Sequence, residues 1–261
     1  GHVLHTETLE TSVDPLSENI YALPFGKQTR PGEYTVTVSI LLKKKTLWAE
    51  AGHEVAFGQY VYQVEETEKL SECGVELVKS LHNIGVRGEN FQVMFSVLNG
   101  GMVSYKYAGR EMIEAIPKPN FWRAPNDNDC GNLMPMRYAQ WKIASMYLSH
   151  KYPTGGPFPA SKEPEIEVTK EWARITFTYC MPTIPASECR LSYQVYGDGT
   201  IQTTLSYDPV KELGDMPEFG VMFKFDADYN QVKWYGMGPS ETYVDRCHGA
   251  KLGIYENTVA E

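Results

Sequence analysis

The stretches RITFTYCM, at residues 174–181, and LSYQVYGDGTIQTTLSY, at residues 191–207, decide the fold of this chain. In both stretches apolar and polar residues alternate with a period of two, which is the pattern of a β-strand with one buried face. Gly197-Asp198-Gly199 predicts a tight turn between two of the strands. Because short turns join antiparallel neighbours, this many strands in one region predict a large sandwich.

Similar alternation extends to both sides of this region. It predicts strands at residues 34–42 and 55–64, a hairpin at 91–107 that turns at Asn99-Gly100-Gly101, and strands at 221–225 and 232–235. A single short helix is expected after residue 133, with Pro135 in its first turn. Its expected buried stripe consists of Met134, Tyr138, Trp141, Ser145 and Leu148. The predicted fold class is therefore all-β with one short helix.

Two segments predict how this fold is divided. Residues 65–76 are rich in charge and almost without alternation, which predicts a domain boundary. Residues 1–67 offer few strands, so we interpret them as the C-terminal part of an immunoglobulin-like sandwich, and residues 68–261 as the larger domain. The prolines and glycines of residues 152–164 predict an exposed connection within that larger domain.

Composition excludes several classes of function. The net charge of the 261 residues is −9, and no basic block exceeds Lys43-Lys44-Lys45, so nucleic acid is not an expected partner. No apolar run approaches the roughly 18 residues of a membrane span, and the first residues lack the features of a signal peptide. The five cysteines lack zinc-finger spacing. Cys180 and Cys189 either pair across a hairpin or are two buried thiols, and we favour the thiols.

The sequence NFWRAPNDNDCGN, at residues 120–132, is the densest group of polar side chains in the chain. Asn and Asp favour turns, and Pro125 restricts the residue before it, so a shaped loop is expected. A calcium loop is disfavoured, because Gly131 occupies the third ligand position and Tyr138 the twelfth. The remaining alternatives are a polar turn that caps the following helix and a carbohydrate-contacting loop beside an aromatic face.

The motif Arg123 to Gly131 resembles the signature loop of the large multidomain bacterial β-galactosidases, family 2 of the glycoside hydrolases. Two more segments resemble late β-sandwich domains of that family, in the right order. They are WAEAGH, at residues 48–53, followed by Gln59, and WYGMGPSETYVDR, at residues 234–246. The resemblance implies the end of an immunoglobulin-like domain followed by an antiparallel supersandwich of the galactose-mutarotase type. It also implies a C-terminal truncation, before the family's aromatic sugar platform.

In that family both catalytic glutamates lie on an upstream (β/α)₈ barrel, and this chain lacks the alternating strands and helices of such a barrel. The resemblance therefore implies that no catalytic residue lies in this chain. It implies instead a substrate loop near the mouth of the active site, which shifts when sugar binds and for which Gly131 is a pivot. The loop residues are Arg123, Asn126, Asp127, Asn128, Asp129 and Gly131. The alternative is a loop that only fastens the domain to the barrel.

Two other groups of residues are candidate sites. Glu241, Tyr243, Asp245 and Arg246 lie close together in sequence, and a carboxylate–guanidinium clamp is favoured over sugar contact. Glu50 and His53 have the spacing of helical metal ligands, but Gly52 and the flanking strands argue against a helix. We expect that segment to be a turn packed by Trp48.

The resemblance also bears on cofactors and partners. It implies no cofactor in this chain, with Mg or Na ions bound elsewhere in the parent enzyme. The expected partners are the remaining domains of the parent, notably the catalytic barrel, and a β-galactoside, in a parent that is a homo-oligomer of the bacterial cytoplasm or periplasm. The alternative functions are a free-standing carbohydrate-binding or mutarotase-like module and a structural oligomerisation module.

Overall fold

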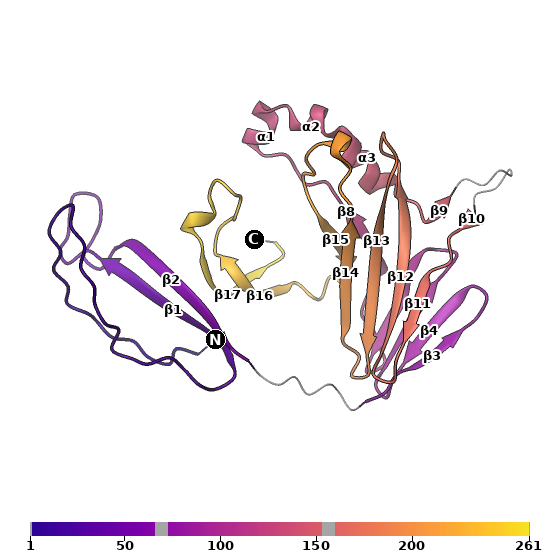
Figure 1. The fold of residues 1–261 in the computed structure, drawn as a ribbon, viewed down its shortest axis with the longest axis horizontal. Coiled ribbons are helices and arrows are strands. Elements are labelled where there is room, and N and C mark those ends of the chain that lie inside the picture. Colours follow the sequence, from indigo (N-terminus) through magenta and orange to yellow (C-terminus); the bar gives the residue numbers. More distant parts are fainter. Residues whose placement is uncertain (1, 66–72, 153–159, 261) are drawn as a thin grey trace. The chain divides into compact units, whose positions relative to one another are not determined.

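The computed structural model describes residues 2–65, 73–152 and 160–260. The chain forms two compact units, of which the first combines Gly1–Glu68 with Tyr229–Glu261 and the second is Lys69–Asp228 (Figure 1). The boundary predicted between residues 67 and 68 lies outside the described residues, so the two-domain division stays a prediction. The last 33 residues belong to the same compact unit as the first 68, although the sequence assigned them to the larger domain.

The second unit contains two antiparallel sheets. The first has the strand order β3 (Glu76–Lys79), β4 (Asn83–Arg87), β5 (Phe91–Ser96), β6 (Gly101–Tyr107) and β7 (Arg110–Glu111). The other has the order β11 (Glu165–Val168), β12 (Trp172–Met181), β13 (Ser187–Tyr196) and β14 (Ile201–Tyr207). In both sheets sequential strands are neighbours, as hairpins require. The prediction of an all-β fold is confirmed.

Smaller strand pairs complete this unit. β8 (Ala115–Asn120) pairs with β15 (Gly220–Lys224), and β9 (Lys151–Tyr152) pairs with β10 (Ala160–Ser161). β8 contains Pro117 and Pro119, and no strand was predicted at these residues. Proline is compatible with this strand because β8 has β15 as its only ladder partner in the described sheets. Most of the connection predicted at residues 152–164 lies outside the described residues.

The helix predicted after residue 133 is present but divided in two, and a further helical turn precedes it. The chain forms α1 (Asp127–Gly131), α2 (Met134–Arg137) and α3 (Ala139–Tyr147), with short 3₁₀ turns at η1 (Lys211–Leu213) and η2 (Cys247–Gly249). Tyr138 separates α2 from α3, because its φ of −118° and ψ of 20° are not helical. Its hydroxyl group donates to Asp215 at 3.2 Å, a contact that periodicity alone does not predict. Of the predicted stripe, only Met134 and Trp141 are fully buried.

The core of the second unit lies between its two sheets. The ring of Phe95 on β5 lies 6.3 Å from that of Phe177 on β12 and 5.4 Å from that of Tyr193 on β13. The alternating residues that the sequence assigned to the inner faces are buried: Phe91, Val93, Phe95, Val97, Ile175, Phe177, Tyr179, Met181, Leu191, Tyr193 and Val195. Each such side chain contributes about 1.5–3 kcal/mol when fully buried. Figure 1 shows β3 and β4 behind the four-stranded sheet and α1–α3 along one end of it.

Two buried tyrosines of this core differ in their hydrogen bonding. Tyr179 donates its hydroxyl to the carbonyl oxygen of Gly100 at 2.6 Å, whereas no partner of the Tyr193 hydroxyl is found among the described residues. We expect Tyr193→Phe to be neutral or to raise the free energy of unfolding by about 1 kcal/mol, because a desolvated hydroxyl is removed. Tyr179→Phe is expected to lower it by about 1–3 kcal/mol, because the Gly100 carbonyl loses its donor. Urea denaturation midpoints of the two variants test this, and equal losses would contradict it.

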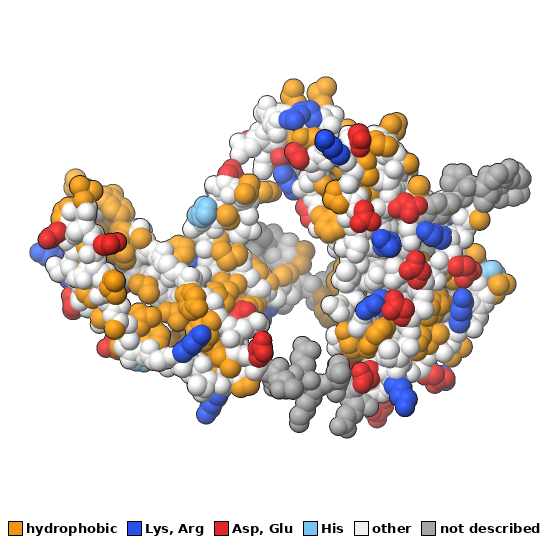
Figure 2. Space-filling view, in the orientation of Figure 1, with side chains coloured by type: hydrophobic (Ala, Val, Ile, Leu, Met, Phe, Trp, Pro, Cys, Tyr) orange, Lys and Arg blue, Asp and Glu red, His pale blue; other side chains and the backbone are white. Residues whose placement is uncertain are grey.

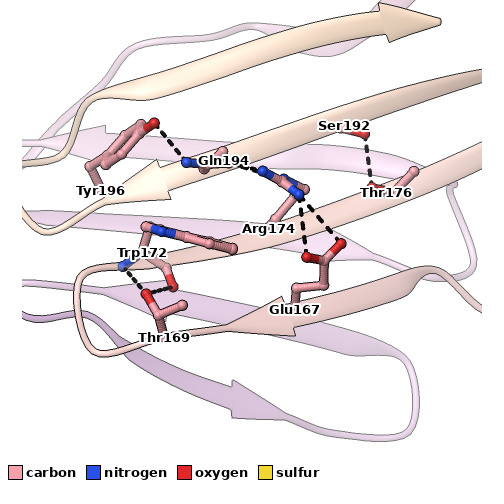
Figure 3. Close-up of polar contacts among 8 residues, drawn as sticks. All are labelled: Glu167, Thr169, Trp172, Arg174, Thr176, Ser192, Gln194 and Tyr196. Carbon is pink, nitrogen blue, oxygen red and sulfur yellow. Dashed lines mark hydrogen bonds and ion pairs between the residues drawn. The ribbon is translucent and has the colours of Figure 1, made fainter.

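The outer face of the four-stranded sheet carries a polar network that crosses three strands (Figure 3). Arg174 on β12 contacts Glu167 on β11 at 3.3 Å and donates to Gln194 on β13 at 2.5 Å. Gln194 in turn donates to the hydroxyl of Tyr196 at 2.6 Å. The guanidinium of Arg174 also lies 4.9 Å from the ring centre of Trp172 and covers it. These cross-strand pairs stabilise the sheet in the observed register.

Cys180 and Cys189 lie on adjacent strands but on opposite faces. In the β12–β13 register Cys180 is opposite Glu188, and Cys189 is opposite Tyr179. Because neighbouring residues of a strand point to opposite sides, Cys189 faces the core while Cys180 faces outward and is half-buried. Both are free thiols, and only Cys189 fits the expectation of a buried one.

The first unit contains two strand pairs, and its predicted strands are present. β1 (Gly32–Leu41) pairs with β2 (Glu54–Val64), and β16 (Gln231–Gly238) pairs with β17 (Lys251–Thr258). Alternation predicted that one face of β1 is buried. At one end of β1 this face is exposed to solvent, since Val38 and Ile40 are 50 % and 59 % exposed. Figure 2 shows hydrophobic side chains spread over the surface of this unit.

The turn predicted between β1 and β2 is present at WAEAGH, residues 48–53. Thr46 donates its N–H to Ala49, and His53 donates its N–H to Glu50. The ring of Trp48 lies edge-on to His53 at 5.3 Å. The expectation that Trp48 packs this turn is wrong in part, because its side chain is 67 % exposed.

Candidate functional site

The polar loop at residues 120–132 begins where β8 ends and is anchored in the core by Phe121. The Phe121 side chain is fully buried, and its ring lies 5.9 Å from that of Trp141 on α3 and 6.3 Å from that of Phe219. Its N–H donates to the Ser145 hydroxyl at 2.8 Å. Since Phe121 is buried, it cannot offer the aromatic face that a sugar-contacting loop was expected to have. Trp122, the next residue of the loop, is half-buried, and Phe219, which is 52 % exposed, lies beside the start of the loop.

Arg123 locks the middle of the loop. Its guanidinium forms a two-pronged ion pair with Asp129, in which Nη2 donates to Oδ1 at 3.0 Å. The same side chain donates through Nε to the Pro217 carbonyl oxygen at 3.1 Å and through Nη1 to that of Ala124 at 3.2 Å. The Arg123 and Asp129 side chains are only 24 % and 14 % exposed. The loop is therefore held both to itself and to the segment that precedes β15.

The second half of the loop is a helical turn, α1, rather than an irregular loop. Asn126 is its N-cap, and the Asn126 side chain accepts a hydrogen bond from the Asp129 N–H at 2.9 Å. In return, the Asp129 carboxylate accepts from the Asn126 N–H at 2.9 Å. This reciprocal arrangement is a capping box, which satisfies two backbone donors at the start of a helix. One predicted alternative for residues 120–132 was a polar turn that caps the following helix. The helix that Asn126 caps is α1, which lies within these residues.

The remaining predicted loop residues lie on the exposed side of this turn. Asp127 and Asn128 are exposed first-turn residues of α1, where negative charge is favourable at a helix N-terminus. Gly131 is the last residue of α1, and a β-carbon added there would meet nothing within 4 Å. The positive φ in this region belongs instead to Leu133, at 59°. In this conformation Gly131 is thus neither strained nor tightly packed.

The pKa of Asp129 is lowered from its ordinary value, first by the hydrogen bond from Arg123 and then by that from the Asn126 N–H. A group whose pKa is lower in the folded state stabilises the fold above its unfolded pKa, about 3.9 for Asp, and loses that effect as the pH falls through the folded pKa. We therefore expect Asp129→Asn to destabilise the protein clearly at about pH 7 and much less at about pH 3. Urea denaturation at both pH values measures this, with Asp127→Asn as control. An Asp129→Asn effect independent of pH would contradict it.

The second group of predicted residues lies in the first unit, between β16 and η2. Arg246 forms an ion pair with Glu241 at 2.8 Å, with side chains that are 67 % and 41 % exposed. Exposed pairs of this kind contribute little to stability. Tyr243 and Asp245 lie in the same exposed turn. The geometry shows a surface ion pair within an exposed turn, and the choice between a structural clamp and sugar contact stays a prediction.

In residues 2–65, 73–152 and 160–260 no group of three or more His, Cys, Asp or Glu side chains is arranged to hold a metal ion. Over the same ranges no helix has both the length and the apolar character of a membrane span.

Residues 87–261, which contain the locked loop, match the protein-family model described as the β-galactosidase small chain. The chain belongs to this family. Residues 1–63 match a second model, described as β-galactosidase domain 4. We refer to residues 87–261 as the small-chain region and to residues 1–63 as the domain-4 region. The resemblance drawn from three short motifs is confirmed over most of the chain.

Several β-galactosidases are similar to the whole chain. A β-galactosidase of Clostridium acetobutylicum is 39 % identical over 261 residues, which are 99 % of this chain and 28 % of that protein. A β-galactosidase of Halalkalibacterium halodurans is 36 % identical over 270 residues. The match covers 100 % of this chain and 25 % of that protein. A β-galactosidase small subunit of Latilactobacillus sakei is 31 % identical over 67 % of this chain and 58 % of its own length. The chain thus spans about a quarter of the length of the full-length relatives.

The sequence missed two parts of the site. The carbonyl oxygen of Pro217 and the ring of Phe219 border the loop but lie more than 90 residues further along the chain. No local pattern predicts such a contact. The capping box was detectable, because Asn126 and Asp129 have the spacing of an N-cap and the third helical residue.

Proposed function

We propose that this chain is a non-catalytic portion of a β-galactosidase that hydrolyses terminal β-D-galactosides. In this proposal the catalytic carboxylates belong to another domain of the longer protein, and the small-chain region supplies the polar loop near the mouth of the active site. The observation that carries the proposal is the locked loop, which presents polar side chains on a rigid frame within a region matched to the small-chain family. Preorganised polar groups on rigid elements are what a sugar site requires.

Arg123 supports this role through its position in the loop. Three of its nitrogen atoms are used to hold the loop, so it positions Asp127 and Asn128 rather than contacting sugar itself. Those two exposed side chains offer carboxylate and amide groups that fit sugar hydroxyls. Arg123, Asn126 and Asp129 are therefore assigned to loop geometry, and Asp127 and Asn128 to the solvent-facing surface.

The partners of the chain in this proposal are the remaining domains of the parent enzyme, including a catalytic barrel, and the β-galactoside. Exposed apolar side chains of the domain-4 region, among them Val38, Ile40 and Trp48, support the existence of a covering partner. The parent is expected to be a homo-oligomer that holds any Mg or Na ion outside this chain.

A chimera tests the proposal. The matching region of the Clostridium acetobutylicum β-galactosidase is replaced by this chain, since the two align over 99 % of it. The chimera is expected to hydrolyse o-nitrophenyl β-galactoside, and Asp127→Ala with Asn128→Ala is expected to raise KM by about tenfold with little change in stability. Lys142→Ala, a change of an exposed residue on α3, is the control. An active chimera whose KM is unaffected by the double change would refute the role of the loop.

Gly131→Ala tests whether Gly131 acts as a pivot of the loop or has only a packing role. Because a β-carbon has room there and alanine is a better helix former than glycine, the free energy of unfolding should be unchanged or rise by up to about 1 kcal/mol. If Gly131 is a pivot, the same change is expected to lower the kcat of the chimera, because loop movement is restricted. Thermal unfolding and steady-state kinetics measure the two effects. Unchanged kinetics in the stable variant would remove the pivot from the proposal.

The alternative of a free-standing sugar-binding module is distinguished with the isolated chain. Titration with galactose and lactose, followed by protein NMR, is expected to give no saturable shifts, because the isolated chain supplies one wall of the site. Saturable shifts centred on residues 120–132 would favour the binding module instead.

A further inference from the structure

The outer face of the four-stranded sheet carries a straight row of planar polar side chains. In the strand register Glu167 on β11 lies opposite Arg174 on β12. Arg174 lies opposite Gln194 on β13, which in turn lies opposite Gln202 on β14. Because neighbouring strands are about 4.8 Å apart, the row repeats at that interval across the whole sheet. It consists of a carboxylate, a guanidinium and two amides, each of which can form more than one hydrogen bond in its plane.

The members of this row hold one another in place but keep hydrogen-bonding capacity. The guanidinium of Arg174 makes four contacts, two with Glu167 and two with Gln194, whereas a guanidinium has five N–H groups. The Glu167 carboxylate is 59 % exposed and can accept further donors. Gln202 is exposed, and its amide nitrogen has no hydrogen-bond partner among the described residues. The row is therefore preorganised, with donors and acceptors left for a ligand.

Aromatic and hydroxyl side chains flank the row on its two sides. On one side Trp172 lies opposite Tyr196, whose hydroxyl accepts from Gln194 at 2.6 Å and donates to Gln202 at 3.1 Å. The other side is a row of hydroxyl groups: Thr176, Ser192 and Thr204. Figure 3 shows the aromatic, planar and hydroxyl side chains in succession along β12 and β13. Sugars suit such a surface, because rings can contact the aromatic groups while hydroxyls pair with the polar ones.

The composition of this face restricts the class of ligand. The outward residues from Trp172 to Thr178 and from Arg190 to Tyr196 include no aliphatic side chain, so the face lacks the apolar core of a stable protein interface. Arg174 is paired with Glu167 and Arg190 with Asp208, so both arginines already have an acidic partner, which disfavours a polyanion. Figure 2 shows acidic and basic side chains interspersed on the face of the second unit that is turned to the viewer. The ligand that fits is neutral and rich in hydroxyl groups.

We propose that this face is a second carbohydrate site, which holds a neutral, linear, β-linked oligosaccharide across strands β11 to β14. A sugar ring in such a chain is about as long as the interval between strands, so successive rings meet successive members of the row. The row has room for four rings, and galactose or lactose engages only part of it. The site holds the protein on a longer glycan. It needs no acid–base group and does not depend on hydrolysis of galactosides.

Isothermal titration calorimetry of the whole 261-residue chain tests this site. The probes are two straight, neutral tetrasaccharides, cellotetraose and β-1,4-galactotetraose. At least one of them is expected to bind with a dissociation constant of about 1 mM or less. Galactose, lactose and the curved chain of maltotetraose are expected not to saturate the protein. Protein NMR is expected to place the shifts within residues 165–206 and not at the loop of residues 120–132.

Gln194→Ala is expected to raise the dissociation constant by at least about tenfold, because it removes a member of the row and frees Arg174 from its position. Gln202→Ala, at the exposed end of the row, is a milder second variant with an expected rise of about threefold. Arg190→Ala is the matched control. It takes an exposed ion pair with Asp208 from the same face, two residue pairs away from the row, and is expected to leave binding unchanged.

Urea denaturation checks that the three variants fold, and Gln202→Ala keeps the test open if Gln194→Ala does not. The proposal is overturned if neither tetrasaccharide gives saturable binding, or if the Gln202→Ala protein binds as tightly as the Arg190→Ala control. A dimer of the chain that is lost in Gln202→Ala would also overturn it, because the face would then belong to a second copy.

Discussion

Replacing Phe121 with alanine is expected to lower the free energy of unfolding of the second unit by about 3–5 kcal/mol. Phe121 is fully buried and lies against Trp141 and Phe219, so the change leaves a cavity between the start of the loop and α3. It also removes the apolar anchor of residues 120–132, while the N–H of residue 121 keeps its hydrogen bond to the Ser145 hydroxyl without the ring that packs beside it. Loss of both the packing and the loop geometry makes this the largest effect that we expect from a single substitution.

Urea denaturation of the isolated chain measures this effect. Phe219→Ala is the matched control, because it removes a ring from the same cluster that is already 52 % exposed. Its expected cost is well under half that of Phe121→Ala, in proportion to the smaller area that it buries. Equal losses for the two variants would show that the loop is not anchored through Phe121.

The second large effect is expected at Arg123. Arg123→Ala removes the ion pair with Asp129 and the hydrogen bonds to the carbonyl oxygens of Ala124 and Pro217. It leaves the Asp129 carboxylate, which is only 14 % exposed, without its guanidinium partner. Hydrogen bonds to charged groups contribute about 1.5–3 kcal/mol each, and water replaces part of those that Arg123→Ala removes. We therefore expect the free energy of unfolding to fall by about 2–3 kcal/mol.

Arg87→Ala provides the control for this prediction. Arg87 forms the same two-pronged pair with Glu76, but both side chains are about 60 % exposed. Water screens such a pair, so its removal is expected to change the urea midpoint far less than Arg123→Ala. In the chimera, Arg123→Ala is further expected to raise KM, whereas Arg87→Ala leaves it unchanged. Equal effects of the two arginines on stability would contradict the assignment of Arg123 as the lock of the loop.

The strands could be predicted from the sequence because their side chains alternate strictly. The apolar residues at every second position from Ile175 to Met181 are buried, although Thr176 and Thr178 between them are buried as well, and the turn at Gly197-Asp198-Gly199 joins β13 to β14 as predicted. The helix after residue 133 could not be predicted as it is, because Tyr138 leaves helical geometry to reach Asp215, far along the chain. β8 was missed for another reason: two prolines oppose a strand unless it has a single ladder partner.

The candidate site, like the fold, could be predicted from the sequence only in part. The capping box of Asn126 and Asp129 follows from local spacing, so the turn-forming character of the loop was predictable. The fixed position of the loop depends on Pro217, Phe219 and Ser145, which the fold brings together from distant segments. The motifs at residues 123–131 and 234–246 identified the family, but they did not show that the second motif lies in a unit with the first 68 residues.

We propose that this chain shapes a galactoside site and carries none of its acid–base chemistry. The most direct test is the release of o-nitrophenol from o-nitrophenyl β-galactoside by the purified isolated chain, measured beside the chimera with the Clostridium acetobutylicum enzyme. We predict no turnover by the isolated chain and steady turnover by the chimera. Steady turnover by the isolated chain, retained through successive purification steps, would contradict the account.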